Sequence, residues 1–123
     1  MTENYKAKFT SDEATYTTEI VDFNIQDGSY TNIGEKDILK LSSHKPPFWV
    51  TFEFVDPNDP LLDYLIKASK NPDTFRPQKV EIPVEIKDSK GTIVISGGII
   101  PKPIKQPSVF IELKCEKVEY LPA

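Results

Sequence analysis

Histidine and cysteine, the side chains that most often act as general base or nucleophile, occur once each in this chain, as His44 and Cys115. A catalytic cysteine needs a neighbouring base, and a catalytic histidine needs an oriented partner. The sequence offers neither residue such a partner at a recognisable spacing. His44 stands in "SSHKPP", which predicts an exposed loop histidine. Cys115 falls among the apolar positions of a predicted strand, which predicts an inert, buried thiol.

Carboxylates are plentiful, but their spacing does not indicate a metal site. The segment "DPNDP" contains two prolines and no glycine, which does not suit the ligand geometry of an EF-hand loop. Asp56 and Asp59 are better explained by turn and helix-capping chemistry. The "SGG" at Ser96–Gly98 lacks the lysine and the following helix of a phosphate loop, so we interpret it as a bend or bulge. We therefore expect no catalytic residue, no cofactor and no metal.

The composition is typical of a single soluble globular domain covering residues 1–123. Its 15 Lys and Arg stand against 19 Asp and Glu, and the two signs are interleaved, which argues against nucleic acid as a partner. No run approaches the roughly 20 apolar residues of a membrane span, so we expect no membrane partner. The start, "MTENYKAKFT", lacks the apolar core of a secretory signal. We expect synthesis in the cytoplasm, and export in a particle without a signal peptide stays open.

One helix is predicted, over about Pro60–Asn71. Asp59 stands at its N-cap and Pro60 at its first position, where a missing N–H costs nothing. Asp63 and Lys67 have the spacing of an exposed ion pair. The apolar residues recur at helical spacing and form one stripe: Leu61, Leu62, Leu65 and Ile66. About three turns are not stable alone in water, so this stripe must pack on another element.

The strands on either side of this helix show an alternation of apolar and polar residues. "FWVTFEF" and "VEIPVEIK" both have period two, and for Trp49 and the phenylalanines we favour core packing over a base-stacking platform. Pro83 indicates an edge or a bulge, because it cannot donate to a ladder. "DSKG" predicts a hairpin turn with Gly91 in the left-handed position, and "TIVISGGII" is the returning strand. The longest strand, "SVFIELKCEKVEYL", changes phase near Lys117, as a β-bulge allows.

Ahead of these strands, "YKAKF" and "TYTTEIVDFNI" predict a first hairpin, and "DILKL" predicts a further short strand. The helix then falls between the fourth and fifth strands. The predicted fold is mainly β, a small rolled β-barrel or sandwich whose one short helix covers one mouth. Many of the 11 prolines lie in the loops "HKPPF", "TFRPQ" and "IPKPIKQPS", which favours either stiff contact surfaces or protection of sheet edges.

Two runs carry a resemblance to a known family. "VTFEFVDPNDPLLDYLIKASKNPDTFRPQKVEIPVEIKDSKGTIVISGGIIPKP" and "PSVFIELKCEKVEYLP" resemble the tube proteins of contractile injection systems, such as the Hcp/TssD tube of type VI secretion and the related phage tail tube. The opening "YKAKFTSDEATYTTEIVDFNI" is also similar to the start of such proteins. The resemblance implies a rolled sheet with one side helix, hexameric rings that stack into a tube, and no catalytic residue. A paralogue that starts, caps or decorates a tube has the same pattern.

The resemblance implies a homo-oligomeric structural subunit, with sheath, spike or baseplate proteins and cargo effectors as further partners. Loop composition suggests stacking contacts in Asp27–Pro47 and lateral or rim contacts in Ile99–Pro107. The expected interface residues are Asp27, Tyr30, Lys36, Lys45, Pro46, Pro47, Ile99, Ile100, Pro101, Lys102, Pro103 and Pro107. The alternative function is a monomeric β-sandwich binding module that recognises a protein or glycan through its proline-rich loops.

Overall fold

The computed structural model describes residues 4–11, 14–33, 38, 40, 41, 43–70, 77–86, 89–105 and 109–122. In this part of the chain the elements follow in the order β1 Tyr5–Thr10, β2 Thr15–Gln26, β3 Phe48–Phe54, α1 Pro60–Ala68, β4 Lys79–Ile86, β5 Ser89–Ser96, β6 Phe110–Cys115 and β7 Lys117–Pro122. All the strands join in one antiparallel sheet with the strand order β6-β3-β2-β1-β4-β5-β7. The predicted mainly β class with a single short helix is confirmed.

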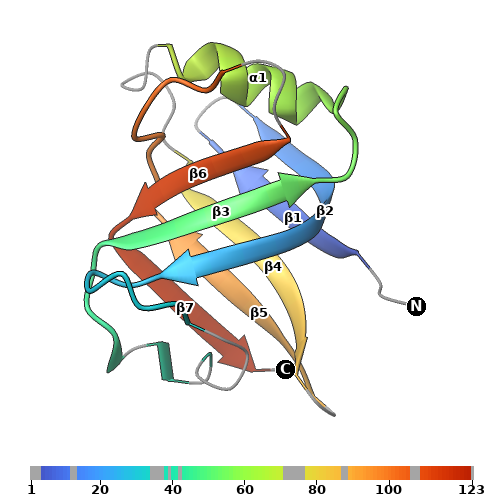
Figure 1. The fold of residues 1–123 in the computed structure, drawn as a ribbon. Coiled ribbons are helices and arrows are strands. Elements are labelled where there is room, and N and C mark those ends of the chain that lie inside the picture. The colour runs from blue at the N-terminus through green and yellow to red at the C-terminus, as the bar shows by residue number, and fades with distance from the viewer. Residues whose placement is uncertain are drawn as a thin grey trace.

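The sheet is rolled into two layers. Figure 1 shows β6, β3 and β2 in front of β1, β4, β5 and β7, with α1 across the upper end. The long strand β2 belongs to both layers: it pairs with β1 up to Ile20, shifts register between Ile20 and Asp22, and then pairs with β3. Ile99, which follows β5, exchanges two backbone hydrogen bonds of 3.0 and 2.9 Å with Lys114 at the edge of β6. The sheet therefore closes on itself through this bridge.

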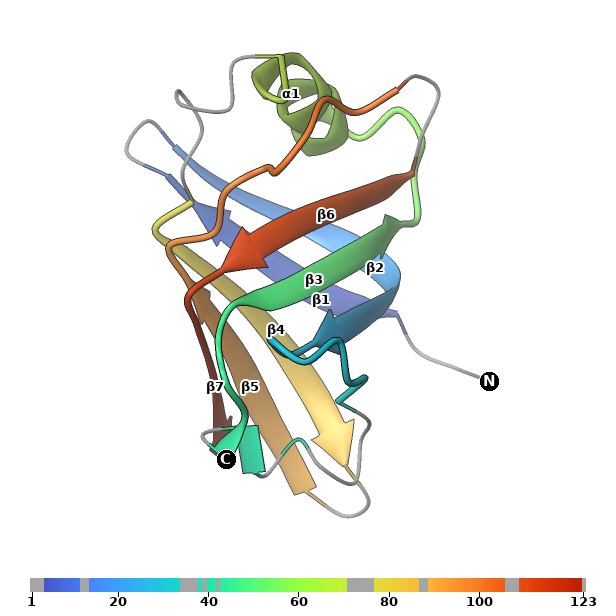
Figure 2. The ribbon, with the colours of Figure 1, turned by 60° about the vertical axis from the view of Figure 1, so that its left-hand side comes forward.

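The predicted change of phase in the last strand is present at Glu116, between β6 and β7. Cys115 and Val118 are both buried although they are three residues apart, so one residue must be skipped between them. β6 pairs with β3, and β7 pairs with β5 in the other layer. The skipped residue is thus the point at which this segment passes between the layers (Figure 2).

The helix begins as predicted and buries the predicted stripe. Oδ1 of Asp59 accepts a hydrogen bond of 2.8 Å from the backbone N–H of Leu61, and Lys67 forms an ion pair of 2.9 Å with Asp63. The stripe packs into the same core cluster as the strands, with these members buried: Leu61, Leu62, Leu65 and Ile66. Among the described residues, no helix combines the length and the apolar character needed to cross a membrane.

The helix ends earlier than predicted, at Ala68. Ser69 follows it and is fully buried. Its hydroxyl donates a hydrogen bond of 2.6 Å to the carbonyl of Ile66 and accepts one of 2.9 Å from the backbone N–H of Ile104. The capping hydroxyl thus ties the helix end to the segment after β5. The predicted end, Asn71, lies outside the described residues.

The prediction of a short strand at "DILKL" is wrong. The described residues Ile38, Lys40 and Leu41 form a 3₁₀ turn, and Ile38 and Leu41 are both buried in the core. Residues three apart share one side of a 3₁₀ turn, whereas they face opposite sides of a strand. Because "DILKL" is not a strand, α1 lies between the third and fourth strands, not between the fourth and fifth. The segments on either side of it, "FWVTFEF" and "VEIPVEIK", are the predicted ones.

The prediction for Gly91 is also wrong. It lies inside β5, opposite Val84, and the strands pair as far as Ile86 and Ser89. A Cβ at this position would lie 2.2 Å from the hydroxyl oxygen of Tyr120. Glycine is therefore required because the tyrosine ring passes over it, and no turn is involved.

Pro83 lies where a proline is tolerated. β4 is flanked by β1 and β5, but its ladder to β1 covers only Lys79 to Glu81. At Pro83 the β1 side of the strand is therefore beyond the ladder, and on that side a backbone N–H is not needed for strand pairing. The predicted edge is present only on the β1 side: β4 is an interior strand, and its ladder to β5 continues through the pair of Pro83 and Thr92 without a bulge.

Candidate functional site

One row of cross-strand neighbours runs over the outer face of β2, β3 and β6. Gln26 pairs with Trp49, and Trp49 pairs with Lys114. Isolated bridges extend the row at its two ends, from Gln26 to Asn32 and from Lys114 to Ile99. Directly opposed residues of antiparallel strands have their side chains on the same face. We call this set, from Asn32 to Ile99, the Trp49 row.

Two side chains pack on the indole of Trp49. The ring of Tyr30 stacks on it with centroids 6.5 Å apart and an interplanar angle of 18°. The ammonium of Lys114 lies over the indole, 5.4 Å from its centroid, which is a cation–π geometry. Tyr30 remains 70% exposed, while Trp49 is half-buried. A large aromatic surface is thus held in place and still open to solvent, as at many protein interfaces.

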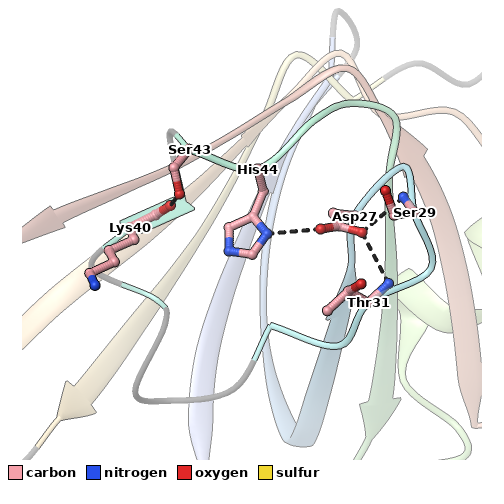
Figure 3. Close-up of polar contacts among 6 residues, drawn as sticks. All are labelled: Asp27, Ser29, Thr31, Lys40, Ser43 and His44. Atoms are coloured by element: carbon pink, nitrogen blue, oxygen red, sulfur yellow. Dashed lines mark hydrogen bonds and ion pairs between the residues drawn. The ribbon is translucent and has the colours of Figure 1, made fainter.

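Tyr30 is positioned by the loop in which it lies. Its φ is +60°, a left-handed conformation that bulky residues seldom adopt. Asp27 imposes this conformation, because its Oδ1 accepts hydrogen bonds from the backbone N–H groups of Ser29 and Thr31, at 2.9 and 3.0 Å (Figure 3). The backbone carbonyl of Asp27 also accepts a bond of 2.9 Å from the N–H of Tyr30. Unusual backbone conformations held by surrounding structure are often found at functional sites.

The other carboxylate oxygen of Asp27 contacts His44. Nδ1 of His44 lies 2.8 Å from Oδ2 of Asp27, and Figure 3 shows the ring directed at the carboxylate across the gap between two loops. The hydrogen bond to His44 is the main reason that the pKa of Asp27 lies below its ordinary value. The bond to the N–H of Thr31 acts in the same direction. The prediction of an exposed loop histidine is wrong, since only 19% of this side chain is exposed.

Among the described residues, no hydroxyl or thiol hydrogen-bonds to the imidazole of His44 in this Asp–His pair, as the nucleophile of a catalytic triad would. The nearby hydroxyl of Ser43 donates to the carbonyl of Lys40 at 2.7 Å, so it is directed away from the imidazole (Figure 3). A second contact joins the same loops: the N–H of Gly28 donates a bond of 2.7 Å to the carbonyl of Lys45. A Cβ on Gly28 would lie 2.5 Å from the carbonyl oxygen of Pro46. The pair therefore acts as a clamp that holds the loop carrying Tyr30 against the segment 43–47.

The predicted interface residues divide into four groups. Exposed on the surface are Tyr30, Lys45, Pro46, Ile99, Lys102 and Pro103, while Pro47 and Pro101 are half-buried. Asp27 and Ile100 are buried, at 6% and 1% exposed, so they support the surface from within. Lys36 and Pro107 lie outside the described residues. Tyr30 and Ile99 were expected in two separate contacts, but both lie at the Trp49 row: Ile99 belongs to it, and Tyr30 stacks on Trp49.

Two functional features escaped the sequence reading. Trp49 lies on the outer face, not in the core, and the available signal was its position in "FWVTFEF", out of phase with the buried phenylalanines. The contact between Asp27 and His44 joins residues 17 positions apart in two loops, for which no periodicity gives a signal. Cys115 is buried as predicted, and burial raises its pKa to about 12. No group of three His, Cys, Asp or Glu side chains within the described ranges could hold a metal ion.

Comparisons with models of protein families, with curated proteins and with solved structures gave no match to this chain. The resemblance to tube proteins therefore stays a prediction from sequence pattern. What the molecule itself offers is a rolled sheet, an ordered loop and an exposed aromatic pair.

Proposed function

We propose that this protein is a structural subunit that assembles with copies of itself into hexameric rings or a stacked tube, as part of a type VI secretion, phage-tail-like or other contractile injection machine. The observation that carries this proposal is the Trp49 row. Tyr30 and Trp49 are the residue types enriched in protein interfaces, and the clamp between Asp27 and His44 already orders the loop that presents them. A pre-ordered contact surface loses little entropy on association.

The arrangement of the two predicted contact segments also supports the proposal. The part of 27–47 that is described lies at the end of the rolled sheet away from α1, whereas the segment after β5 runs along the side and up to the helix (Figure 2). The bond between Ile104 and Ser69 marks its upper end. Contacts at an end and contacts at a side can form at the same time, which a stack of rings requires.

The test is the mass of the purified protein in solution over a wide range of concentration and salt, together with negative-stain images. We expect a species larger than the monomer, with rings in the images. Trp49→Ala and Tyr30→Ala should shift the population towards monomer without changing the unfolding midpoint much. Val55→Ala, which truncates an exposed apolar residue outside the row, serves as the control. A monomer at every concentration and salt would end the tube proposal.

The second candidate is the monomeric binding module for a protein or glycan. The pre-ordered loop that carries Tyr30 also favours a binding module. A module whose loops are already ordered loses less conformational entropy when its partner binds. The two candidates differ in one measurable way. The module remains monomeric when its partner is absent, and Tyr30→Ala then leaves its mass unchanged.

A further inference from the structure

The two layers of the rolled sheet present outer faces that point in opposite directions (Figure 1). The aromatic face is the outer side of β6, β3 and the second half of β2, and it contains Trp49, Phe110, Asp22, Glu53, Glu112 and Lys114. The lysine face is the outer side of β1, β4, β5, β7 and the first half of β2. Among the residues whose side chains are described, its cations are Lys6, Lys8, Lys79 and Lys117 and its carboxylates are Glu19, Glu81 and Glu119. The two faces differ in both charge and apolar content.

The aromatic face has an excess of negative charge. Its three carboxylates stand against Lys114, whose ammonium lies over the indole of Trp49. Within the described residues, no cation lies within ion-pair distance of Glu53 or Glu112. These two residues are diagonal neighbours on adjacent strands. Glu112 of β6 pairs with Thr51, and Glu53 lies two residues after Thr51 in β3. They form a small acidic patch beside an exposed phenylalanine, which is 55% exposed.

Among the described side chains, the lysine face has four lysines against three glutamates, an excess of one positive charge. Lys79 and Lys117 are each neutralised by a glutamate of their own strand, Glu81 and Glu119, at 2.6 Å. Lys6 and Lys8 extend from β1 and are exposed. Lys6 lies opposite Glu19 and Lys8 opposite Glu81. The hydrogen bond from Lys79 lowers the pKa of Glu81, and the charge of Lys8 also helps to lower it. No described carboxylate lies within ion-pair distance of either Lys6 or Lys8, so both ammonium groups remain accessible to a partner.

The lysine face also has apolar residues in reach of a partner. Pro83 pairs with Thr92, and Thr92 pairs with Leu121, which is 50% exposed. The lysine face thus places lysines beside exposed apolar side chains, and the aromatic face places carboxylates beside the exposed Phe110. The two faces are therefore complementary in charge, and both contribute apolar area.

We infer that the aromatic face of one copy binds the lysine face of the next copy. Glu53 and Glu112 would then face Lys6 and Lys8, and Phe110 would pack near Leu121. This inference rests on the proposed function, because it names the surfaces through which copies associate side by side. Two different faces on opposite sides make a heterologous contact, which closes into a ring when the rotation per copy divides a full turn and otherwise continues as a filament.

The test uses two full-length variants that each reverse one face. Glu53→Lys with Glu112→Lys makes both faces basic, and Lys6→Glu with Lys8→Glu makes both faces acidic. Each variant alone should self-associate at least about tenfold more weakly than the wild type, because like charges are then opposed. An equimolar mixture should recover the association, since each reversed face then meets a face of opposite charge on the other variant. Asp63→Lys, on the exposed side of α1, is the matched control.

Circular dichroism of each variant verifies the fold. A charge-reversed variant that does not fold is replaced by its neutral counterpart, Glu53→Gln/Glu112→Gln or Lys6→Gln/Lys8→Gln. In the neutral variants we expect the self-association to weaken to a smaller degree. Wild-type association that survives in either reversed variant overturns the inference while the proposed function stands. Loss of association in the Glu53→Lys/Glu112→Lys variant alone indicates that the aromatic face binds the aromatic face of another copy, and this result also overturns the inference. If both charge-reversed variants associate weakly and their equimolar mixture does not recover the association, the inference is overturned as well. A wild type that is monomeric under all conditions removes the proposed function itself.

Discussion

At one end of the rolled sheet α1 lies across the opening, and at the other end lies the described part of the segment 27–47 (Figure 2). Both ends contribute to the same core cluster: α1 inserts its leucine stripe, and the loop end inserts Ile33, Ile38 and Leu41. They differ in what fixes them from outside. At the helix end α1 is tied by two hydrogen bonds, one from a hydroxyl of β2 to the capping carboxylate and one from the segment after β5 to the hydroxyl of Ser69, whereas at the loop end the tie is a carboxylate–imidazole pair.

The two helix tethers connect segments that are distant in sequence. Asp59 caps α1 with one carboxylate oxygen and accepts a hydrogen bond from the hydroxyl of Thr18 in β2 with the other. Ser69 joins the other end of α1 to Ile104. The helix is thus fixed at both of its ends, and most of its stabilisation comes from burial. Among the described residues, the loop end buries three apolar side chains against four on α1, and the bond to His44 lowers the pKa of its carboxylate Asp27. We therefore expect the stability of the loop end to depend on pH.

Leu65→Ala is the substitution with the largest expected effect. Leu65 is completely buried between α1 and the sheet, and truncation of a buried leucine costs about 2–5 kcal/mol. The free energy of unfolding, measured by urea titration, should fall by that amount. Lys67→Ala on the exposed side of the same helix should change it by less than about 0.5 kcal/mol. Equal effects of the two changes would contradict the packing of α1 described above.

Asp59→Ala should have the next largest effect. It removes the N-cap of α1 and leaves the hydroxyl of Thr18 without this acceptor, and loss of an N-cap costs about 0.5–2 kcal/mol. Urea unfolding gives the loss, and Thr18→Val, which removes only the tether, should give a smaller one. If Asp59→Ala left stability unchanged, the helix end would be held by burial alone.

Asp27→Asn should have a smaller effect that depends on pH. The pKa of Asp27 lies below its ordinary value of 3.8 in the folded chain, chiefly because of the bond to His44. The ionised carboxylate therefore stabilises the fold above that pH, and this contribution is lost as the pH falls through the folded pKa. Wild type and variant should differ in stability near neutral pH and converge in acid.

The same variant also tests the clamp. Near neutral pH, Asp27→Asn should loosen the contact between Tyr30 and Trp49, which the fluorescence of the only tryptophan reports. Asp63→Asn, at an exposed carboxylate of the helix end, is the control. A stability difference that does not vary with pH would show that the pair with His44 does not stabilise the loop end electrostatically.

The smallest expected effect is the chemical labelling of Cys115, which lies in β6 between the two ends of the rolled sheet. Burial raises its pKa to about 12, so the thiolate that reacts is almost absent at neutral pH. A thiol reagent should label it only as fast as the protein unfolds, and urea should accelerate the labelling. Rapid stoichiometric labelling of the folded protein would place the sulfur outside the core and would reopen an enzymatic function.

Short-range patterns account for most of what could be predicted. The period-two alternation of "FWVTFEF" assigned its buried residues correctly, and the capping chemistry of Asp59 and Pro60 located the start of α1. Both depend on the geometry of neighbouring residues, which a sequence specifies directly. The 3₁₀ turn at Ile38 and Leu41 was read as a strand because a few apolar residues fit either period, and only the space left in the core decides between them.

What the sequence by itself determined is the class of this protein: mainly β, with one amphipathic helix, a buried cysteine and a change of phase in the last strand. What only the tertiary structure decided is the candidate site. The rolling of the sheet brings Trp49, Lys114 and Ile99 into one row and places Tyr30 on Trp49, although the four residues come from four separate segments. It also brings Asp27 to His44. These contacts depend on how strands that are distant in sequence pair, and that pairing follows from the burial of the whole core.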